Sequence, residues 1–446
     1  MSTTTAASKG DFSPSNIVIE PDIPICQTDL PLDRYQEEFK SYAEEYLALP
    51  DRLPATVLPW MDSYIRPAMD HFGNEIMLLA HYYMGGEIVK LVERYGGHIA
   101  DSYALALQTR RHPETKLFVE SAVHFMAESI AILAADDQDV YITNPRAGCT
   151  MEMMAKDFML EPAFDDLQAR YGDEILVIAY MNTSGRVKAM AGRTGGSVCT
   201  SSNAKKIMQW ALNQNKKIFF VPDRHLGENS AGQVGIPPEL HFVWPGPQEA
   251  PGLRWDRLNA EQQAQCDRSQ LILWGGFCGV HTVFSQKQIA YWHDQGYRVL
   301  VHPECPKTVV DAADGSGSTR YLWDAVMDAA AGARFAIGTE GHFVNNLREQ
   351  AARKNVQVVN LADVPDPNFP SMGCGCATMS RNDPPHLVAI LDLLRQGKAP
   401  THNRVQPGDS VNERTGFRDR LSRLEQQEVV RYARQSLETM IAVTES

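Results

Sequence analysis

The sequence has few cysteines, no block of basic residues and no long apolar run. Eight cysteines in 446 residues are too few for a disulfide scaffold, so they are candidates for metal binding or chemistry in a reducing compartment. The formal charge of −13 argues against a nucleic acid or an anionic membrane surface as the main partner. No apolar run reaches the roughly 18–20 residues of a membrane span, and the start MSTTTAASKGDFSPS lacks the apolar core of a signal peptide. We therefore expect a soluble cytoplasmic protein that binds neither nucleic acid nor a membrane.

The most informative feature that is present is a pattern that recurs three times from about Glu75 onward. In each unit a short apolar run ends at a polar or aromatic residue, and a helical stretch with a glycine turn then leads to a hydroxyl residue. The strand-end residues are His81, Tyr180 and His302, and the hydroxyl residues are Ser102, Ser201 and the Ser318–Thr319 pair. In the first two units the hydroxyl residue follows the strand end by the same 21 residues. Equal spacing indicates that the units share one fold.

Strand-like and helix-like segments alternate four times in each unit, which favours parallel sheets covered on both faces. The predicted fold class is α/β, with three similar α/β/α domains in a pseudo-threefold arrangement around a common centre. The predicted segments are a disordered lead-in (1–30), an accessory helical segment (31–74), three repeats (75–171, 172–295 and 296–398) and a C-terminal tail with a helix (399–446). Residues 241–269 have no counterpart in the other repeats, and we expect them to form a surface insertion.

All three units end in a cysteine that follows a glycine-containing turn. These cysteines are Cys149, Cys278, and either Cys374 or Cys376. Three thiolates around one centre suit a zinc ion or an iron–sulfur cluster, and buried structural thiols are the alternative. Zinc sites usually contain closely spaced cysteine pairs, so thiols about a hundred residues apart favour a cluster at a domain interface. With three ligands, a four-iron cluster keeps one iron open as a Lewis acid. The remaining cysteines are predicted not to be ligands: Cys26, Cys199, Cys266 and Cys305.

The hydroxyl residues each precede a good helix, so we expect them to be N-caps. Three capped helix N-termini that face one centre would bind anions such as carboxylates or phosphate. Positions i and i+2 of an extended segment face the same side, so each unit would present a polar pair to the centre. The pairs are His81 with Tyr83, Tyr180 with Asn182, and His302 with Glu304. His281, three residues after Cys278, could orient or border the metal centre, and the helical residues His124, His225 and His342 could be structural.

The motifs of this sequence resemble those of the quinolinate synthase family. They are HYY…DS, VHFMAE, PRAGC, YMNTSGRVKA, CTSSNA, PDRHLG, W-x-G-x-C-x-V-H, VHPEC, GST, IGTEG and C-x-x-M, in the family's order between about Glu75 and Gly397. The resemblance implies three α/β/α domains around one [4Fe-4S] cluster that has three cysteine ligands and one open iron. It implies Cys149, Cys278 and Cys376 as ligands, because the family's final cysteine precedes a Pro-or-Ala-x-Met pattern that here begins at Ala377.

The implied reaction condenses iminoaspartate (iminosuccinate) with dihydroxyacetone phosphate to quinolinate, with loss of phosphate and two waters, in de novo NAD biosynthesis. By motif, the substrate-binding residues are His81, Ser102, Tyr180, Met181, Asn182, Ser201, His302, Pro303, Glu304 and Thr319, with Tyr83 and Met126 also lining the pocket. The expected catalytic residues are Glu304, His302, Tyr83 and His81, with Glu304 moving protons and Tyr83 or His81 as its partner. The usual Q-x-P-E after the first His-x-Tyr is Met84-Gly85-Gly86-Glu87 here, so the loop there could close differently.

Two other functions fit parts of the pattern. A zinc hydrolase would use the same Cys and His residues, and a non-catalytic redox sensor would use the cluster only as a switch. The sensor has no need for the His, Tyr, Ser and Glu residues at the strand ends. The enzyme that supplies iminoaspartate is a further possible partner, through a transient contact.

Overall fold

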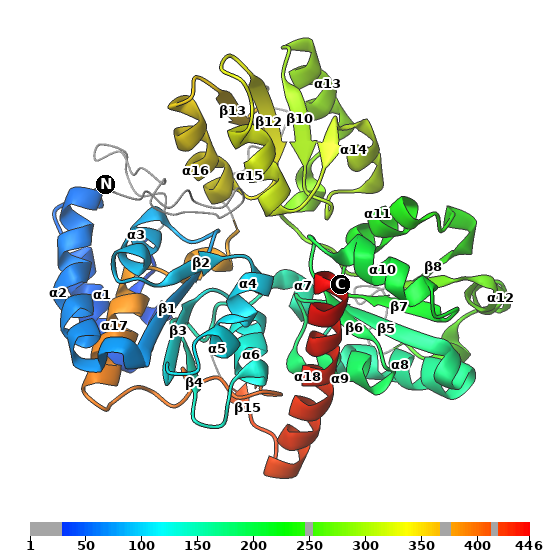
Figure 1. Cartoon of the computed structure of the whole chain (residues 1–446), viewed down its shortest axis with the longest axis horizontal. Helices are drawn as coiled ribbons and strands as arrows, with labels where there is room; N and C mark the ends of the chain where they lie inside the picture. The colour runs from blue at the N-terminus through cyan, green and yellow to red at the C-terminus, as the bar shows by residue number, and fades with distance from the viewer. Residues whose placement is uncertain (1–28, 246–252, 366–375, 412–417) are drawn as a thin grey trace, which may run out of the picture.

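Three parallel β-sheets form the framework of the protein. The structure is a computed structural model that describes residues 29–245, 253–365, 376–411 and 418–446. Figure 1 shows the three sheets in three lobes around the middle of the molecule. The first sheet contains β1 (Ile76–His81), β2 (His98–Ala100), β3 (Leu117–Ser121) and β4 (Asp139–Ile142). The second contains β5 (Ile175–Tyr180), β6 (Ser197–Cys199), β7 (Lys217–Val221), β8 (His241–Trp244) and β9 (Leu271–Trp274). The third contains β10 (Arg298–Val301), β11 (Gly315–Ser316), β12 (Arg334–Gly338) and β13 (Gln357–Asn360).

The three sheets repeat one strand order. The first and third sheets run β2-β1-β3-β4 and β11-β10-β12-β13, and the second runs β6-β5-β7-β9-β8. The paired strands in all three are parallel. Because the strands of each sheet are parallel, their carboxyl ends lie at one edge of that sheet.

The region at 241–269 is more than the expected surface insertion. Its first residues form β8, which pairs with β9 and adds a fifth strand to the second sheet. Phe242, Trp244 and Leu258 from this region are buried in a core with the strands of the same sheet. The segment HFVW thus fills an edge position of the sheet, so the expected surface insertion needs correction at this strand, whereas most of residues 253–268 are exposed or half-buried.

Helices follow most strands and cover the sheets. Those in the first lobe are α3 (Gly86–Arg94), α4 (Ser102–Ala106), α5 (Gln108–Arg111), α6 (His124–Leu133) and α7 (Thr150–Met153). Helix α8 (Asp157–Tyr171) follows them in sequence and packs on the second sheet. The second lobe also has α9 (Gly185–Arg193), α10 (Ala204–Leu212), α11 (Arg224–Val234) and α12 (Ala260–Arg268). Helix α13 (Gln286–Asp294) follows them in sequence and packs on the third sheet. The third lobe has α14 (Lys307–Ala312), α15 (Thr319–Met327) and α16 (Gly341–Ala352). No helix in the described ranges is both long and apolar enough to cross a membrane.

Helices from both ends of the chain complete the first lobe. Helices α1 (Lys40–Leu47) and α2 (Pro54–Phe72) pack against α17 (Pro384–Arg395), which follows the third sheet in sequence. The hydroxyl group of Tyr42 donates a hydrogen bond of 2.7 Å to Asp392. The chain therefore returns from the third lobe to the first one before it enters the C-terminal tail.

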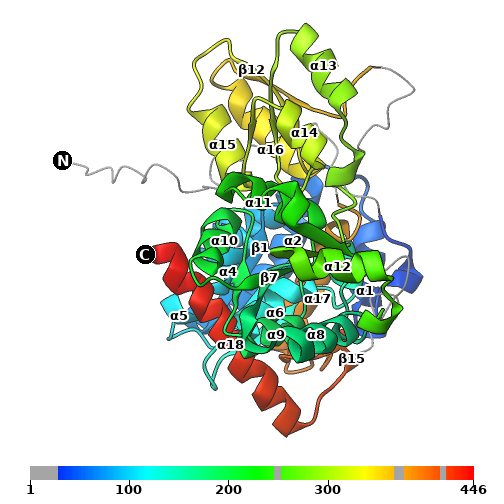
Figure 2. The ribbon, with the colours of Figure 1, turned by 90° about the vertical axis from the view of Figure 1, so that its right-hand side faces the viewer.

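The last helix joins the first two lobes. Helix α18 (Arg423–Glu445) runs beside α9, as Figures 1 and 2 both show. The guanidinium group of Arg434 donates to the carbonyl oxygens of Ile132 and Ala134 at the end of α6, both at 2.9 Å. Ser436 donates to the carbonyl oxygen of Lys188 on α9, also at 2.9 Å. This helix fastens the C-terminal end of α6 in the first lobe to α9 in the second.

Candidate active site

One pocket lies where the carboxyl ends of the first strands of the three sheets meet. It is lined by residues from all three lobes, including the strand-end residues His81, Tyr180 and His302. Nearly all of the site residues predicted from the sequence line it. These are His81, Tyr83, Ser102, Met126, Tyr180, Met181, Asn182, Ser201, His302, Glu304 and Thr319, together with Cys149, Cys278 and Cys376. Pro303 is absent from the lining; it is buried, and its carbonyl oxygen accepts a hydrogen bond of 2.8 Å from Asn229.

Three of the six described free cysteines share this pocket, one from the end of each repeat. Burial, the Glu304 carboxylate and the other two thiols raise the pKa of Cys278 well above its usual range. The pKa of Cys149 is raised as well, mainly by burial. A bound metal would hold such thiols in the ionised thiolate form. This donor set fits a metal cluster with three thiolate ligands. The alternative Cys374 lies outside the described residues.

The other described cysteines are not among the residues that line the pocket. Cys199 is buried in β6, and Cys305 is buried with its thiol 3.8 Å from the carbonyl oxygen of Gly338. Cys266 is buried in α12, where the hydroxyl group of Tyr171 lies 3.8 Å from its sulfur.

Two strand-end histidines have the same local geometry. The Nδ1 atom of His81 accepts the backbone N–H of Tyr83 at 3.3 Å, and Nδ1 of His302 accepts that of Glu304 at 3.4 Å. Burial lowers the pKa of His81 to about 4 and, with a further contribution from His281, that of His302 to about 3. Both rings are therefore neutral at pH 7, and an accepting Nδ1 leaves the proton on Nε2. Each ring can donate one hydrogen bond from Nε2.

Glu304 is the centre of a buried hydrogen-bond network. The Tyr180 hydroxyl donates to its Oε1 at 2.5 Å, and Nδ1 of His281 lies 2.7 Å from its Oε2. Burial alone would raise the pKa of Glu304, but the neighbouring His281 and His302 and the hydrogen bonds lower it to about 2. Glu304 is therefore a carboxylate at pH 7. Its described contacts include Tyr180 and His281, while Tyr83 and His81, the predicted partners in proton transfer, line the same pocket.

His281 has a defined place in this network. Its Nε2 atom lies 3.1 Å from the hydroxyl oxygen of Thr339, and its ring stacks on that of His302 with 4.5 Å between the ring centres. Cys278, His281 and Glu304 bring one possible ligand atom each within 4.8 Å of the others. The two ring nitrogens of His281 lie close to Glu304 and Thr339, so this histidine is better placed to orient Glu304 than to bind a metal.

The hydroxyl residues lie at the pocket, but only one of the three units has the expected N-cap. Asp101 caps α4 by accepting the N–H of Ala104 at 2.9 Å, and Asn203 is the N-cap of α10. The predictions that Ser102 and Ser201 are N-caps are therefore wrong. Asp caps a helix as well as Ser and precedes Ser102, whereas the Oδ1 atom of Asn203 makes no cap hydrogen bond and accepts the N–H of Thr200 at 2.6 Å. In the third unit Ser318 caps α15 as expected, which leaves Thr319 as the first helical residue.

Two residues that sequence reasoning missed fix the backbone around the site. Asn229 on α11 donates to the carbonyl oxygens of Pro303 and Cys305, at 2.8 and 2.9 Å, on either side of Glu304. Glu128 on α6 accepts the N–H of Gly185, the first residue of α9, at 2.6 Å. These contacts join segments far apart in the chain, so local sequence patterns do not show them. Of the two residues, only Glu128 has a signal in the sequence, because it ends the VHFMAE motif.

Comparison with known proteins decides the family. The family model described as quinolinate synthetase A protein matches residues 65–413. The quinolinate synthase of Lysinibacillus sphaericus is 36% identical over 375 residues, which cover 84% of this chain and 95% of that protein. That of Staphylococcus carnosus is 33% identical over 409 residues, covering 91% of this chain and 98% of that protein. The chain belongs to the quinolinate synthase family.

The quinolinate synthase match includes every residue that lines the pocket. It ends before α18, so the helix that joins the first two lobes lies outside the matched range. The resemblance drawn from the motifs is confirmed.

Proposed function

We propose that this protein is a quinolinate synthase that condenses iminoaspartate with dihydroxyacetone phosphate. The products are quinolinate, phosphate and two waters, and the reaction serves de novo NAD biosynthesis. We also propose that Cys149, Cys278 and Cys376 hold a [4Fe-4S] cluster with one open iron, around which the three lobes are arranged with pseudo-threefold symmetry. The observation that carries this proposal is that one cysteine from each repeat lines the same pocket as the polar strand-end residues.

The pocket is suited to anions that bind through neutral donors. Among the described lining residues there is no Lys or Arg. Both substrates are anionic, so their carboxylate and phosphate oxygens would accept hydrogen bonds from Nε2–H of His81 and His302 and from hydroxyl groups. The hydroxyl groups of Tyr83 and Thr319 lie 3.3 Å apart at the start of α15, whose N-terminal N–H groups favour an anion.

Glu304 is placed to accept a proton during the dehydration and tautomerisation steps. It is ionised, buried and hydrogen-bonded to the hydroxyl group of Tyr180, which also lines the pocket. The Tyr180 oxygen could take a proton from substrate as its own hydroxyl proton moves to the Glu304 carboxylate across their 2.5 Å hydrogen bond. His281, between Glu304 and Thr339, keeps the carboxylate in this orientation. The cluster, when bound, supplies a Lewis-acidic iron.

The test is an anaerobic assay of the purified protein. Iron and sulfide are measured, and quinolinate is quantified after addition of dihydroxyacetone phosphate and iminoaspartate generated from oxaloacetate and ammonia. We expect a brown protein with about four irons per chain that forms quinolinate. Zinc in place of iron would support a hydrolase, and a full cluster without quinolinate formation would support a redox sensor. Either result would overturn the proposal.

A further inference from the structure

Two buried acidic side chains hold the backbone of two of the cysteines in the pocket. The carboxyl group of Asp223 accepts the N–H of Cys278 at 3.1 Å through Oδ2. The carboxyl group of Glu340 accepts the N–H of Cys376 at 3.0 Å through Oε1. Both side chains are fully buried. Burial of a carboxyl group costs solvation free energy, so the groups that it contacts indicate its role in the structure.

The two acids occupy the same place in their repeats. Each is the N-cap of the helix that follows the third strand of its unit: Asp223 caps α11 and Glu340 caps α16. The second oxygen of each carboxyl group accepts a helix N–H, from Leu226 at 2.6 Å and from Phe343 at 2.9 Å. Each acid therefore uses one oxygen for its helix and the other for the cysteine turn, and Oε1 of Glu340 also lies 2.9 Å from Nδ1 of His342.

The first unit is built differently. The N-cap of α6 is Val123, which has no hydrogen-bonding side chain. The equivalence is supported by the backbone: the N–H of His124 donates to the carbonyl of Ala147, and that of Arg224 donates to the carbonyl of Gly276, two residues before the cysteine in both units. Cys149 is itself the N-cap of α7, so the start of that short helix places it.

We propose that Asp223 and Glu340 are positioning residues that fix the Cys278 and Cys376 turns, so that their thiolates are held in place for the cluster. The inference rests on the proposed cluster. The cysteine N–H groups are committed to protein carboxyl groups, which sets the direction of each Cα–Cβ bond before the cluster binds. Outer contacts of this kind typically change metal affinity by about 10–100-fold when they are removed.

The test compares Asp223→Asn and Glu340→Gln with the wild-type protein after anaerobic reconstitution. An amide has one accepting oxygen, so it can accept the helix N–H or the cysteine N–H but not both. We expect iron loss to a chelator to become at least about tenfold faster in each variant. Asp383→Asn is the matched control, because Asp383 is also a buried N-cap and its described hydrogen-bond partners are Tyr35 and His386. It should release iron at the wild-type rate.

A third variant separates helix capping from the cysteine contact. Asp223→Ser keeps a good N-cap, so it should fold as stably as the wild type. Because the serine hydroxyl cannot accept both N–H groups, the variant should still release iron faster. The melting temperature of the cluster-free protein and the electron paramagnetic resonance spectrum of the reduced cluster accompany each rate. Wild-type iron retention in folded Asp223→Ser and Glu340→Gln would overturn the positioning role. A wild-type protein that binds no iron and sulfide would instead overturn the proposed cluster itself.

Discussion

The change of Glu304 to Gln tests the proton-transfer assignment most directly. Glu304 is 3% exposed, and its oxygens contact the Tyr180 hydroxyl at 2.5 Å and His281 at 2.7 Å. Because the pKa of Glu304 is lowered to about 2, the wild-type side chain is a proton acceptor at any pH used in an assay. Glutamine has nearly the same shape and can still accept from Tyr180, but it cannot take up a proton.

We therefore expect a folded Glu304→Gln protein with its cluster and a turnover at least about a hundredfold lower. That factor is the usual scale for losing a general acid or base, and it corresponds to about 2.7 kcal/mol in the activation free energy. Quinolinate formation is measured anaerobically on protein with equal iron and sulfide content. The matched control is Glu45→Gln, because the exposed side chain of Glu45 on α1 also accepts a hydrogen bond of 2.5 Å, from Tyr64 on α2. If Glu304→Gln turned over at nearly the wild-type rate, Glu304 would be only a structural partner of Tyr180 and His281.

Two further predictions concern the cysteines and the histidines. Replacement of Cys149, Cys278 or Cys376 by Ser should abolish the cluster and activity, whereas Cys26→Ser, Cys266→Ser and Cys374→Ser should retain both, as measured by iron, sulfide and quinolinate. Loss of iron in Cys374→Ser together with its retention in Cys376→Ser would contradict the choice of ligand. The lowered pKa values of His81 and His302, about 4 and about 3, mean that below about pH 6.5 the unfolded chain takes up protons that the folded chain does not. The free energy of unfolding is therefore highest above pH 6.5, and it falls toward pH 4 by up to about 1.4 kcal/mol per pH unit for each histidine. In urea unfolding, the stability of His81→Asn should depend less on pH than that of the wild type. An equal dependence would refute the lowered pKa of His81.

The sequence predicted the parts of the site that depend on local pattern. The apolar runs that end at His81 and Tyr180 are strands with the predicted ends, because a buried parallel strand has a recognisable composition. Local pattern failed where two neighbouring residues can each cap a helix, as with Asp101 and Ser102 at the start of α4. It could not show that His281 contacts Glu304, since that contact depends on how the segment after β9 packs against the one after β10. The edge strand β8 within 241–269 was missed because it has no counterpart in the other repeats, so comparison of the repeats gave no signal for it.

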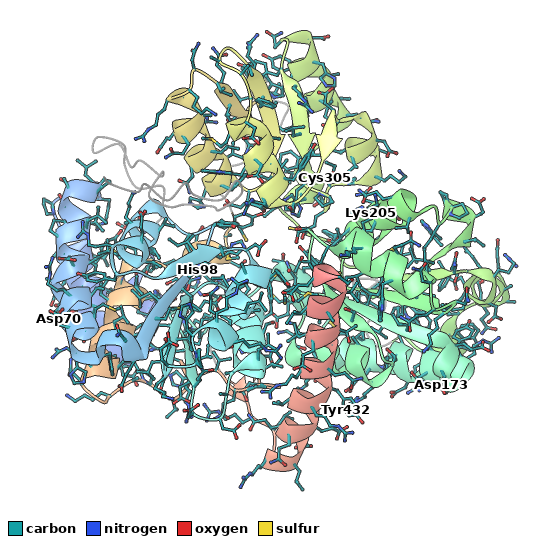
Figure 3. The ribbon with its side chains drawn as sticks, viewed as in Figure 1. Asp70, His98, Asp173, Lys205, Cys305 and Tyr432 are labelled. Carbon is teal, nitrogen blue, oxygen red and sulfur yellow. The ribbon has the colours of Figure 1, made fainter. Side chains whose placement is uncertain are left out.

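The close packing of α18 on α9 has an evolutionary consequence. A Cβ atom at Gly192 would lie 2.0 Å from the backbone oxygen of Tyr432, a residue labelled on α18 in Figure 3. A side chain at this position and a helix seated as α18 is are therefore mutually exclusive. Among quinolinate synthases, the two features should vary together: members with a helix in this place should have glycine there, and members with a larger residue should lack the helix or hold it farther away. A glycine at this position in an alignment would then identify the members that have a helix packed as α18 is.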